Sequence, residues 1–209
     1  MVTNSKTATK PYHHGDLREE ILCAAITLLE ENNIGSLSLR AVAKKVGVSH
    51  TAPYRHYKDK DQLLAGIAQR GYDELAKELA EAVEQYPDNP IEQLTEAGYR
   101  YVKMGTQRPQ CTQLMFGGHF PCADTYPELR ASGDAAFMGV KHIIEQGQLK
   151  RQFKKGDIET LALAAWSGIH GLTLLIISGS LPDILKINSS ERELTAAITS
   201  TMLSGILAR

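Results

Sequence analysis

Apolar residues recur along this chain with the spacing of α-helices. In the first such stretch they lie three or four positions apart, as on one face of a helix, and they are Leu17, Ile21, Ala24, Ala25, Leu28 and Leu29. Asp16, followed three residues later by Glu19, has the pattern of a capping box at the start of this helix. Asn32, Asn33 and Gly35 indicate its end. Because the alternating pattern of β-strands is almost absent, the sequence predicts an all-α fold.

The same start and stop signals divide the rest of the chain into further helices. A short helix is expected after Ser38, and another from Ser49 to Tyr57. Asp59 and Gln62 are expected to cap a long helix that ends before Pro87. The remaining segments predicted are helices at about 90–107, 127–147, 157–177 and 190–208, with a loop-rich stretch at 108–126. The expected total is about nine helices.

Residues 38–60, SLRAVAKKVGVSHTAPYRHYKDK, have the pattern of a helix-turn-helix. Two short helices that cross steeply need a small residue at their closest approach, which Ala43 provides. Gly47, four positions later, is the residue type that a tight turn with positive φ favours. Ser49 has a side-chain oxygen that can cap the second helix. The residues expected to fill the wedge between the helices are Val42, Val46 and Val48.

Polar and cationic side chains cluster in and around the second helix of this motif. A helix whose N terminus enters the major groove brings its first side chains to base edges, and later ones to phosphates. Lys60 opens the following helix, where a cation opposes the helix dipole unless a phosphate lies nearby. The alternative for each lysine and arginine is a solvated surface charge, and Tyr57 is expected to be a core aromatic. The residues predicted to contact DNA are Ser38, Arg40, Ser49, His50, Thr51, Tyr54, Arg55, His56, Lys58 and Lys60.

This stretch resembles the TetR family of bacterial regulators over about residues 16–64. The matching pattern is a small residue, Gly-Val-Ser, Tyr-x-x-aromatic and a Lys-acid pair, present here as Ala43, Gly47-Val48-Ser49, Tyr54 with Tyr57, and Lys60-Asp61. The resemblance implies phosphate contacts by Ser38, Tyr54 and Lys60. It also implies that His50 and Thr51 face bases, and that Arg55 and His56 lie near the DNA backbone.

A narrower resemblance extends over most of the chain, to the subgroup whose C-terminal domain is named for a Trp-His-Gly motif. The segments that carry it are YHHGDLR at 12–18, APYRH at 52–56 and Trp166-x-x-x-His170-Gly171. Pro53 departs from the general family, where an aliphatic residue is usual. Because proline lacks an N–H and is accommodated only near a helix start, the recognition helix is expected to be short or tilted. Whether His50 and Thr51 contact bases is therefore left open by the sequence.

The segment 157–177 is apolar on nearly every side, so a helix formed by it must be covered all round. The last predicted helix, 190–208, offers one cover and a second subunit offers another; the alternative is a core helix in a monomer. The resemblance implies a homodimer through these last two helices, as in the TetR family. A two-fold dimer presents two recognition helices to successive grooves, which implies a palindromic or nearly palindromic operator.

The expected architecture has three parts: a flexible arm at 1–14, a helix-turn-helix domain at 15–62, and a larger regulatory and dimerisation domain at 63–209, which the long helix joins to it. Regulation requires a pocket whose filling by a small-molecule effector changes the spacing of the two DNA-binding heads. The candidate ligand contacts are Tyr101, Met104, Met115, Phe116, Phe137, Met138, Trp166 and His170. The alternative for each is a core position, and for His170 a hydrogen-bonded core histidine.

Charge and composition narrow the function classes. Residues 1–60 carry nine lysines and arginines against six acids, and the remainder carries fourteen against eighteen. This asymmetry, unless it arose by chance, indicates that the front end meets a polyanion. The N terminus is polar, and the apolar stretch Leu172 to Ile177 is too short to span a bilayer, so we expect a cytoplasmic protein.

Enzyme motifs are not found in the sequence: it has no glycine-rich phosphate loop, nucleophile elbow or His-Glu-x-x-His. Cys111, His119 and Cys122 leave open a thiol- or metal-responsive regulator, although their spacing lacks a fourth zinc ligand. Neither an enzyme nor a cofactor is expected. The sequence predicts a homodimeric repressor that a small molecule releases from its operator; the alternatives are an activator and an enzyme with a nucleic-acid-binding appendage.

Overall fold

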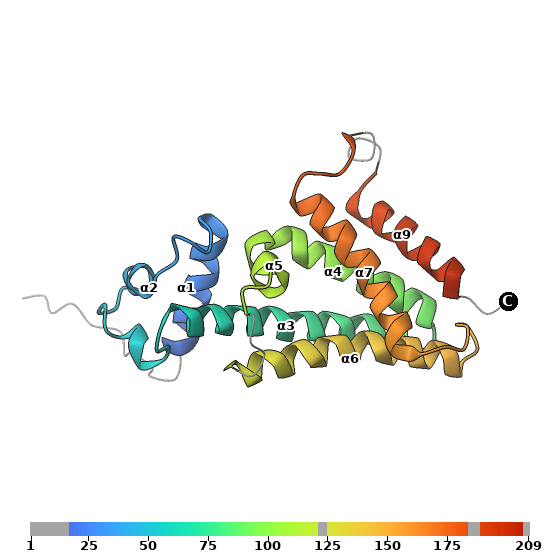
Figure 1. Ribbon diagram of the computed structural model, residues 1–209, viewed down its shortest axis with the longest axis horizontal. Coiled ribbons are helices and arrows are strands. Elements are labelled where there is room, and N and C mark those ends of the chain that lie inside the picture. The colour runs from blue at the N-terminus through green and yellow to red at the C-terminus, as the bar shows by residue number, and fades with distance from the viewer. Residues whose placement is uncertain (1–16, 121–124, 184–188, 207–209) are drawn as a thin grey trace, which may run out of the picture. The chain divides into compact units, whose positions relative to one another are not determined.

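The computed structural model describes residues 17–120, 125–183 and 189–206, and across these ranges its regular elements are eight α-helices and one 3-10 turn (Figure 1). They are α1 (Leu17–Glu31), α2 (Leu39–Val46), η1 (Pro53–Arg55), α3 (Lys60–Gln85), α4 (Pro90–Gln107), α5 (Pro109–Phe116), α6 (Pro127–Leu149), α7 (Ile158–Ile177) and α9 (Glu191–Ile206). The predicted all-α class is confirmed. The chain divides into two compact units, between Leu63 and Leu64.

The N-terminal unit forms around α1 and α2, which pack against each other. On α1, Ile21 and Leu29 are fully buried at the predicted helical spacing. Ser38 caps α2, since its Oγ accepts a hydrogen bond from the Ala41 N–H at 3.2 Å. The predicted turn is also present: Gly47 has a φ of 82°, and the Ala43 carbonyl accepts hydrogen bonds from the Gly47 and Val48 N–H groups, each at 3.0 Å.

The predicted helix from Ser49 to Tyr57 is wrong in its extent, because only η1 forms within it. Pro53 is the first residue of this turn and is buried, and no side chain caps the turn. The Ser49 hydroxyl lies 3.2 Å from the Thr51 hydroxyl and is not a helix cap. Tyr57, only 2% exposed, is the expected core aromatic.

Helix α3 begins as predicted. The Asp59 carboxylate accepts a hydrogen bond from the Gln62 N–H at 2.8 Å, and the Gln62 side-chain carbonyl accepts one from the Lys58 N–H at 2.5 Å. The first bond satisfies a donor that the first helical turn would otherwise leave unpaired, and the second ties the residue before Asp59 to that turn.

The C-terminal unit is a bundle in which α4 packs against α6, α7 and α9. Helices α3 and α6 lie side by side (Figure 1), and a Cβ at Gly139 of α6 would come 3.2 Å from Leu79 of α3. Val102, Ile143 and Ile144 are fully buried in the core of this bundle.

The segment predicted to be a loop contains α5, so this expectation is wrong at 109–116. Pro109 occupies the first helical turn, where the missing N–H costs nothing, rather than breaking a helix. Leu114 and Met115 are buried and hold α5 in the bundle.

Helix α7 has the length and composition of a membrane-crossing helix, and 28% of its most apolar window is buried. The sequence-based expectation considered only the stretch Leu172 to Ile177 and therefore underestimated the length of the apolar helix. Its buried positions include Ala165, Ile169 and Leu172, whereas Leu174 and Leu175 are 39% and 45% exposed. Within the part of the chain that the structure describes, α7 is thus covered on one side only.

Candidate DNA interface and ligand cavity

The side chains predicted to meet DNA lie at the surface of the N-terminal unit. Eight of the ten are exposed, namely Ser38, Arg40, Ser49, His50, Thr51, Tyr54, Arg55 and Lys58. His56 and Lys60 are half-buried. Tyr54, at 50% exposed, is one of the few large apolar side chains that the structure leaves in solvent. The exposed candidates all lie within residues 38–60, a span of 23 residues, and are available to one polyanion.

Lys60 has a structural role that the sequence did not reveal. Its ammonium donates hydrogen bonds to the carbonyl oxygens of Ile34 and Gly35, at 2.5 and 3.2 Å. These carbonyls follow α1 and account for a cation at the start of α3 without any phosphate. Because an ammonium has three donors, one remains for a DNA phosphate.

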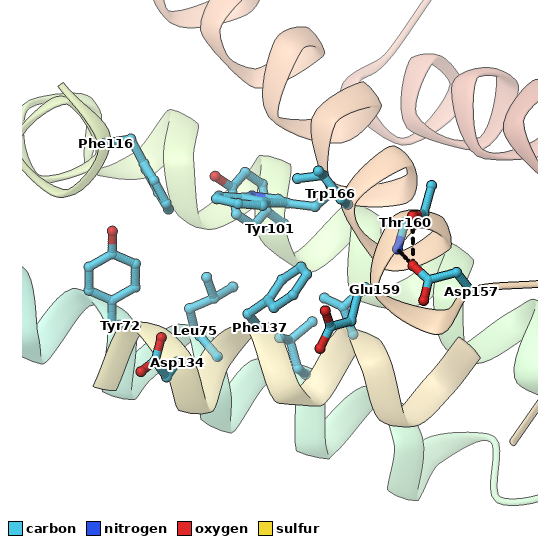
Figure 2. Close-up of a pocket in the computed structure, with 15 residues that line it drawn as sticks. Tyr72, Leu75, Tyr101, Phe116, Asp134, Phe137, Asp157, Glu159, Thr160 and Trp166 are labelled. Carbon is cyan, nitrogen blue, oxygen red and sulfur yellow. Dashed lines mark hydrogen bonds between the residues drawn. The ribbon is translucent and has the colours of Figure 1, made fainter. Parts of the chain in front are cut away.

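The C-terminal unit contains a cavity of about 620 Å³ between α3, α4, α5, α6 and α7 (Figure 2). Five aromatic side chains line it: Tyr72, Tyr101, Phe116, Phe137 and Trp166. The polar side chains that line it are Asp134, Asp157, Glu159 and Thr160. This size, and apolar walls with a few polar groups, are typical of small-molecule sites.

The aromatic rings are in contact with one another. Phe116 lies edge-on to Tyr72, with ring centroids 5.3 Å apart, and 5.7 Å from Trp166. Phe137, from α6, lies 5.9 Å from Trp166. Figure 2 shows these rings converging on the cavity from α3, α5, α6 and α7. The cavity is therefore built by residues far apart in the sequence.

Two tyrosines tie the helices around the cavity together. The Tyr101 hydroxyl lies 2.8 Å from Nδ1 of His170. Burial raises the pKa of Tyr101 and lowers that of His170, so this hydrogen bond joins a neutral phenol and a neutral imidazole. The Tyr72 hydroxyl donates to the Met115 carbonyl at 2.9 Å, and burial raises the pKa of Tyr72 to about 12.

Four of the eight predicted ligand contacts line this cavity: Tyr101, Phe116, Phe137 and Trp166. His170 is not among the lining residues. It forms a hydrogen bond with Tyr101, as in the alternative of a hydrogen-bonded core histidine. The methionines do not join the lining. Met104 borders a separate polar cavity, Met115 is buried beside Gly71, and Met138 is 56% exposed on α6.

Sequence reasoning missed Tyr72 and the three carboxylates at this cavity. The signal for Tyr72 was its position three residues before Leu75, on the buried face of the long helix. Glu159 lies four and seven residues before Leu163 and Trp166, so all three share one face of α7.

The metal alternative gains no support from the described residues, which contain no group of three or more potential ligands. Cys111 is buried and His119 is exposed, while Cys122 lies outside the described residues. The arm at 1–14 and the capping residue Asp16 also lie outside them.

Residues 21–67 match the family of bacterial regulatory proteins described as the tetR family. The chain is 31% identical over 81 residues to the HTH-type transcriptional regulator AcrR of Shigella flexneri, a match that covers 39% of this chain. It covers only 38% of that relative's length.

Solved structures extend the likeness to the whole fold. A protein of unknown function from Rhodococcus sp. RHA1 is 29% identical with a TM-score of 0.84, over 96% of this chain and all of that one. The regulator FadR from Bacillus subtilis, solved with stearoyl-CoA, is 14% identical with a TM-score of 0.73, over 90% of this chain and 98% of that one. The fold is also that of solved TetR-family regulators.

Proposed function

We propose that this chain, a DNA-binding transcriptional regulator of the TetR family, is a cytoplasmic homodimeric repressor that leaves a palindromic operator when a small molecule fills the cavity. The observation that carries the proposal is the pairing of an exposed helix-turn-helix with an aromatic cavity in one chain. Neither feature alone would suggest regulation, because DNA binding needs no cavity and ligand binding needs no helix-turn-helix.

The DNA contacts divide into two kinds. The exposed His50 and Thr51 precede η1, and we assign them to base edges. Ser38, Tyr54 and Lys60 are assigned to phosphates. The Ser38 oxygen accepts the capping bond, so its hydroxyl hydrogen is available for a phosphate oxygen. The remaining members of the proposed set, near the DNA backbone, are Arg40, Ser49, Arg55, His56 and Lys58.

The proposed dimer uses the outward sides of α7 and α9. Leu174, Leu175 and Ile198 are between 37% and 45% exposed on these two helices. Burying them against a second copy would remove apolar surface from water and cover the exposed side of α7. The resemblance to the TetR family implies a homodimer through the same two helices.

Within the family, we assign the chain to the subgroup with a Trp-His-Gly motif in its C-terminal domain. Trp166 lines the cavity and His170 holds Tyr101, so the first two motif residues support the ligand site. The third, Gly171, has open space where a Cβ would point.

The proposal is tested by gel retardation with DNA from upstream of the chain's own gene. We expect a retarded complex that unlabelled specific DNA removes and scrambled DNA does not. Equal competition by both DNAs would contradict sequence-specific regulation.

A dimer variant completes the test. The double substitution Leu174→Glu and Leu175→Glu should give a monomer by light scattering and abolish the retarded complex. Leu149→Glu, at a residue 69% exposed on α6, is the matched control and should leave both unchanged. A dimer that survives the double substitution would exclude this interface.

A further inference from the structure

We infer that the effector is a hydrophobic cation, such as an aromatic amine or quaternary ammonium; this rests on the proposed effector role of the cavity. The fifteen residues that line the cavity include three carboxylates and no lysine, arginine or histidine. A positively charged ligand is complementary to this lining, whereas a negatively charged ligand is not.

The aromatic rings supply the first part of the recognition. A cation is attracted to the face of an aromatic ring, most strongly to tryptophan, and this attraction grows when water is excluded. Trp166, Tyr101 and Phe137 surround the same space (Figure 2). A flat hydrophobic cation can stack there while its apolar part contacts Leu75 and Leu79.

The carboxylates supply the second part. Asp134 belongs to α6, while Asp157 and Glu159 flank the start of α7. Asp157 accepts hydrogen bonds from the N–H and hydroxyl of Thr160, at 2.7 and 2.6 Å. These neutral donors lower its pKa and so keep it charged.

Two cations already neutralise part of this charge from outside the lining. Lys141 donates to Glu159 at 2.7 Å, and Arg130 lies 3.9 Å from Asp134. Asp134 and Glu159 are 76% and 71% exposed, so solvent weakens both pairs and leaves both carboxylates accessible to a ligand. Three carboxylates against two cations leave the polar part of the cavity lining with a net negative charge.

An anionic effector does not fit this wall. A carboxylate or phosphate needs lysine, arginine or backbone donors, and would meet Asp134 and Glu159 instead. FadR from Bacillus subtilis, solved with stearoyl-CoA, is similar in fold at 14% identity. The lining residues of this chain favour the opposite ligand charge.

The chain offers a direct probe, because Trp166 is its one tryptophan. Tryptophan fluorescence can be titrated with three biphenyl ligands of nearly equal shape, carrying a trimethylammonium, a neutral tert-butyl or a carboxylate group. We expect the cation to bind about tenfold more tightly than the tert-butyl compound, and the carboxylate to bind most weakly.

Variants then assign the selectivity to the carboxylates. Asp134→Asn with Glu159→Gln should weaken binding of the cation by about fivefold and leave the tert-butyl compound unchanged. Glu145→Gln, an exposed acid on α6 outside the lining, is the matched control and should change neither.

The outcomes separate the two proposals. If the neutral or anionic compound binds as tightly as the cation, the inference of a cationic effector is overturned while the effector role of the cavity stands. If the double variant keeps full selectivity for the cation, the assignment to Asp134 and Glu159 fails. If no compound changes the fluorescence of Trp166, the effector role itself fails, and the inference with it.

Discussion

The two units of this chain carry their proposed functions in different ways. In the N-terminal unit, the candidate DNA contacts come from one run of 23 residues, and most of them are exposed. In the C-terminal unit, the cavity wall runs from Tyr72 to Trp166 and comes from five helices. A surface that binds DNA can be formed by one short sequence motif. A cavity forms only when helices that are distant in the sequence pack together.

The same contrast separates two tyrosines three residues apart. Tyr54 is exposed, whereas Tyr57 is 2% exposed, and the Arg18 guanidinium lies 5.7 Å from the Tyr57 ring centroid. One is available to DNA and the other holds the motif in place. Substitutions at Tyr54 and Tyr57 therefore separate the effect on folding stability from the effect on DNA binding.

Tyr57→Ala should have the largest effect, because it removes a buried aromatic. We expect a loss of about 3–5 kcal/mol in the free energy of unfolding, measured by urea denaturation of the full chain. Tyr54→Ala is the matched control: stability should change by less than about 0.5 kcal/mol, while operator affinity falls. A larger loss of stability for Tyr54→Ala than for Tyr57→Ala would reverse the assignment.

His50→Ala and Lys60→Ala should separate base reading from phosphate binding. We expect His50→Ala to remove about 1–3 kcal/mol of preference for operator over scrambled DNA. Lys60→Ala should weaken binding to both DNAs and also lower stability, because two carbonyls lose their donor. Fluorescence anisotropy on the two duplexes measures both effects. Equal losses for His50→Ala on the two duplexes would remove it from the base-reading set.

Gly47→Ala should cost about 1–2 kcal/mol of unfolding free energy, because Gly47 has a φ of 82°. No atom lies within 4 Å of the position of an added Cβ, so the cost is backbone strain alone. Gly47→Asn should cost less, since asparagine tolerates this region. Thermal denaturation of the two variants compares them, and an asparagine variant less stable than the alanine variant would contradict a purely conformational cost.

The smallest expected effect is a pH dependence from His170 in the C-terminal unit. Burial lowers its pKa, so the unfolded chain binds a proton more readily than the folded one. This contribution to stability is fully present above about pH 6.5, the unfolded pKa, and is lost as pH falls through the folded value. Urea denaturation of the wild type and of His170→Gln, at pH 7.5 and below 6, should show a smaller decrease for the variant. Identical decreases would exclude His170.

The N-terminal unit could be predicted more fully than the C-terminal unit, because its features depend on residues that are close together in the sequence. Ser38, Gly47 and Asp59 act through neighbours within four residues, so their roles as cap, turn and cap were predictable from the sequence. The helix expected around Pro53 was too long, because the proline limits regular structure to a short 3-10 turn.

In the C-terminal unit the pattern identified apolar residues but not which of them face a cavity. Phe137 and Met138 are adjacent on α6, yet one lines the cavity and the other is exposed. Their difference depends on where α3 and α7 lie against α6. Asp134 and Glu159 are 76% and 71% exposed, so the sequence could not distinguish them from other surface charges, although they border the cavity.

The most direct test of the central claim is native mass spectrometry of the full chain with a duplex from upstream of its own gene. The account predicts that chains bind the duplex in pairs, and that the biphenyl trimethylammonium releases them together. A complex with one chain per duplex, or one that persists when the cation saturates the fluorescence change of Trp166, would contradict it.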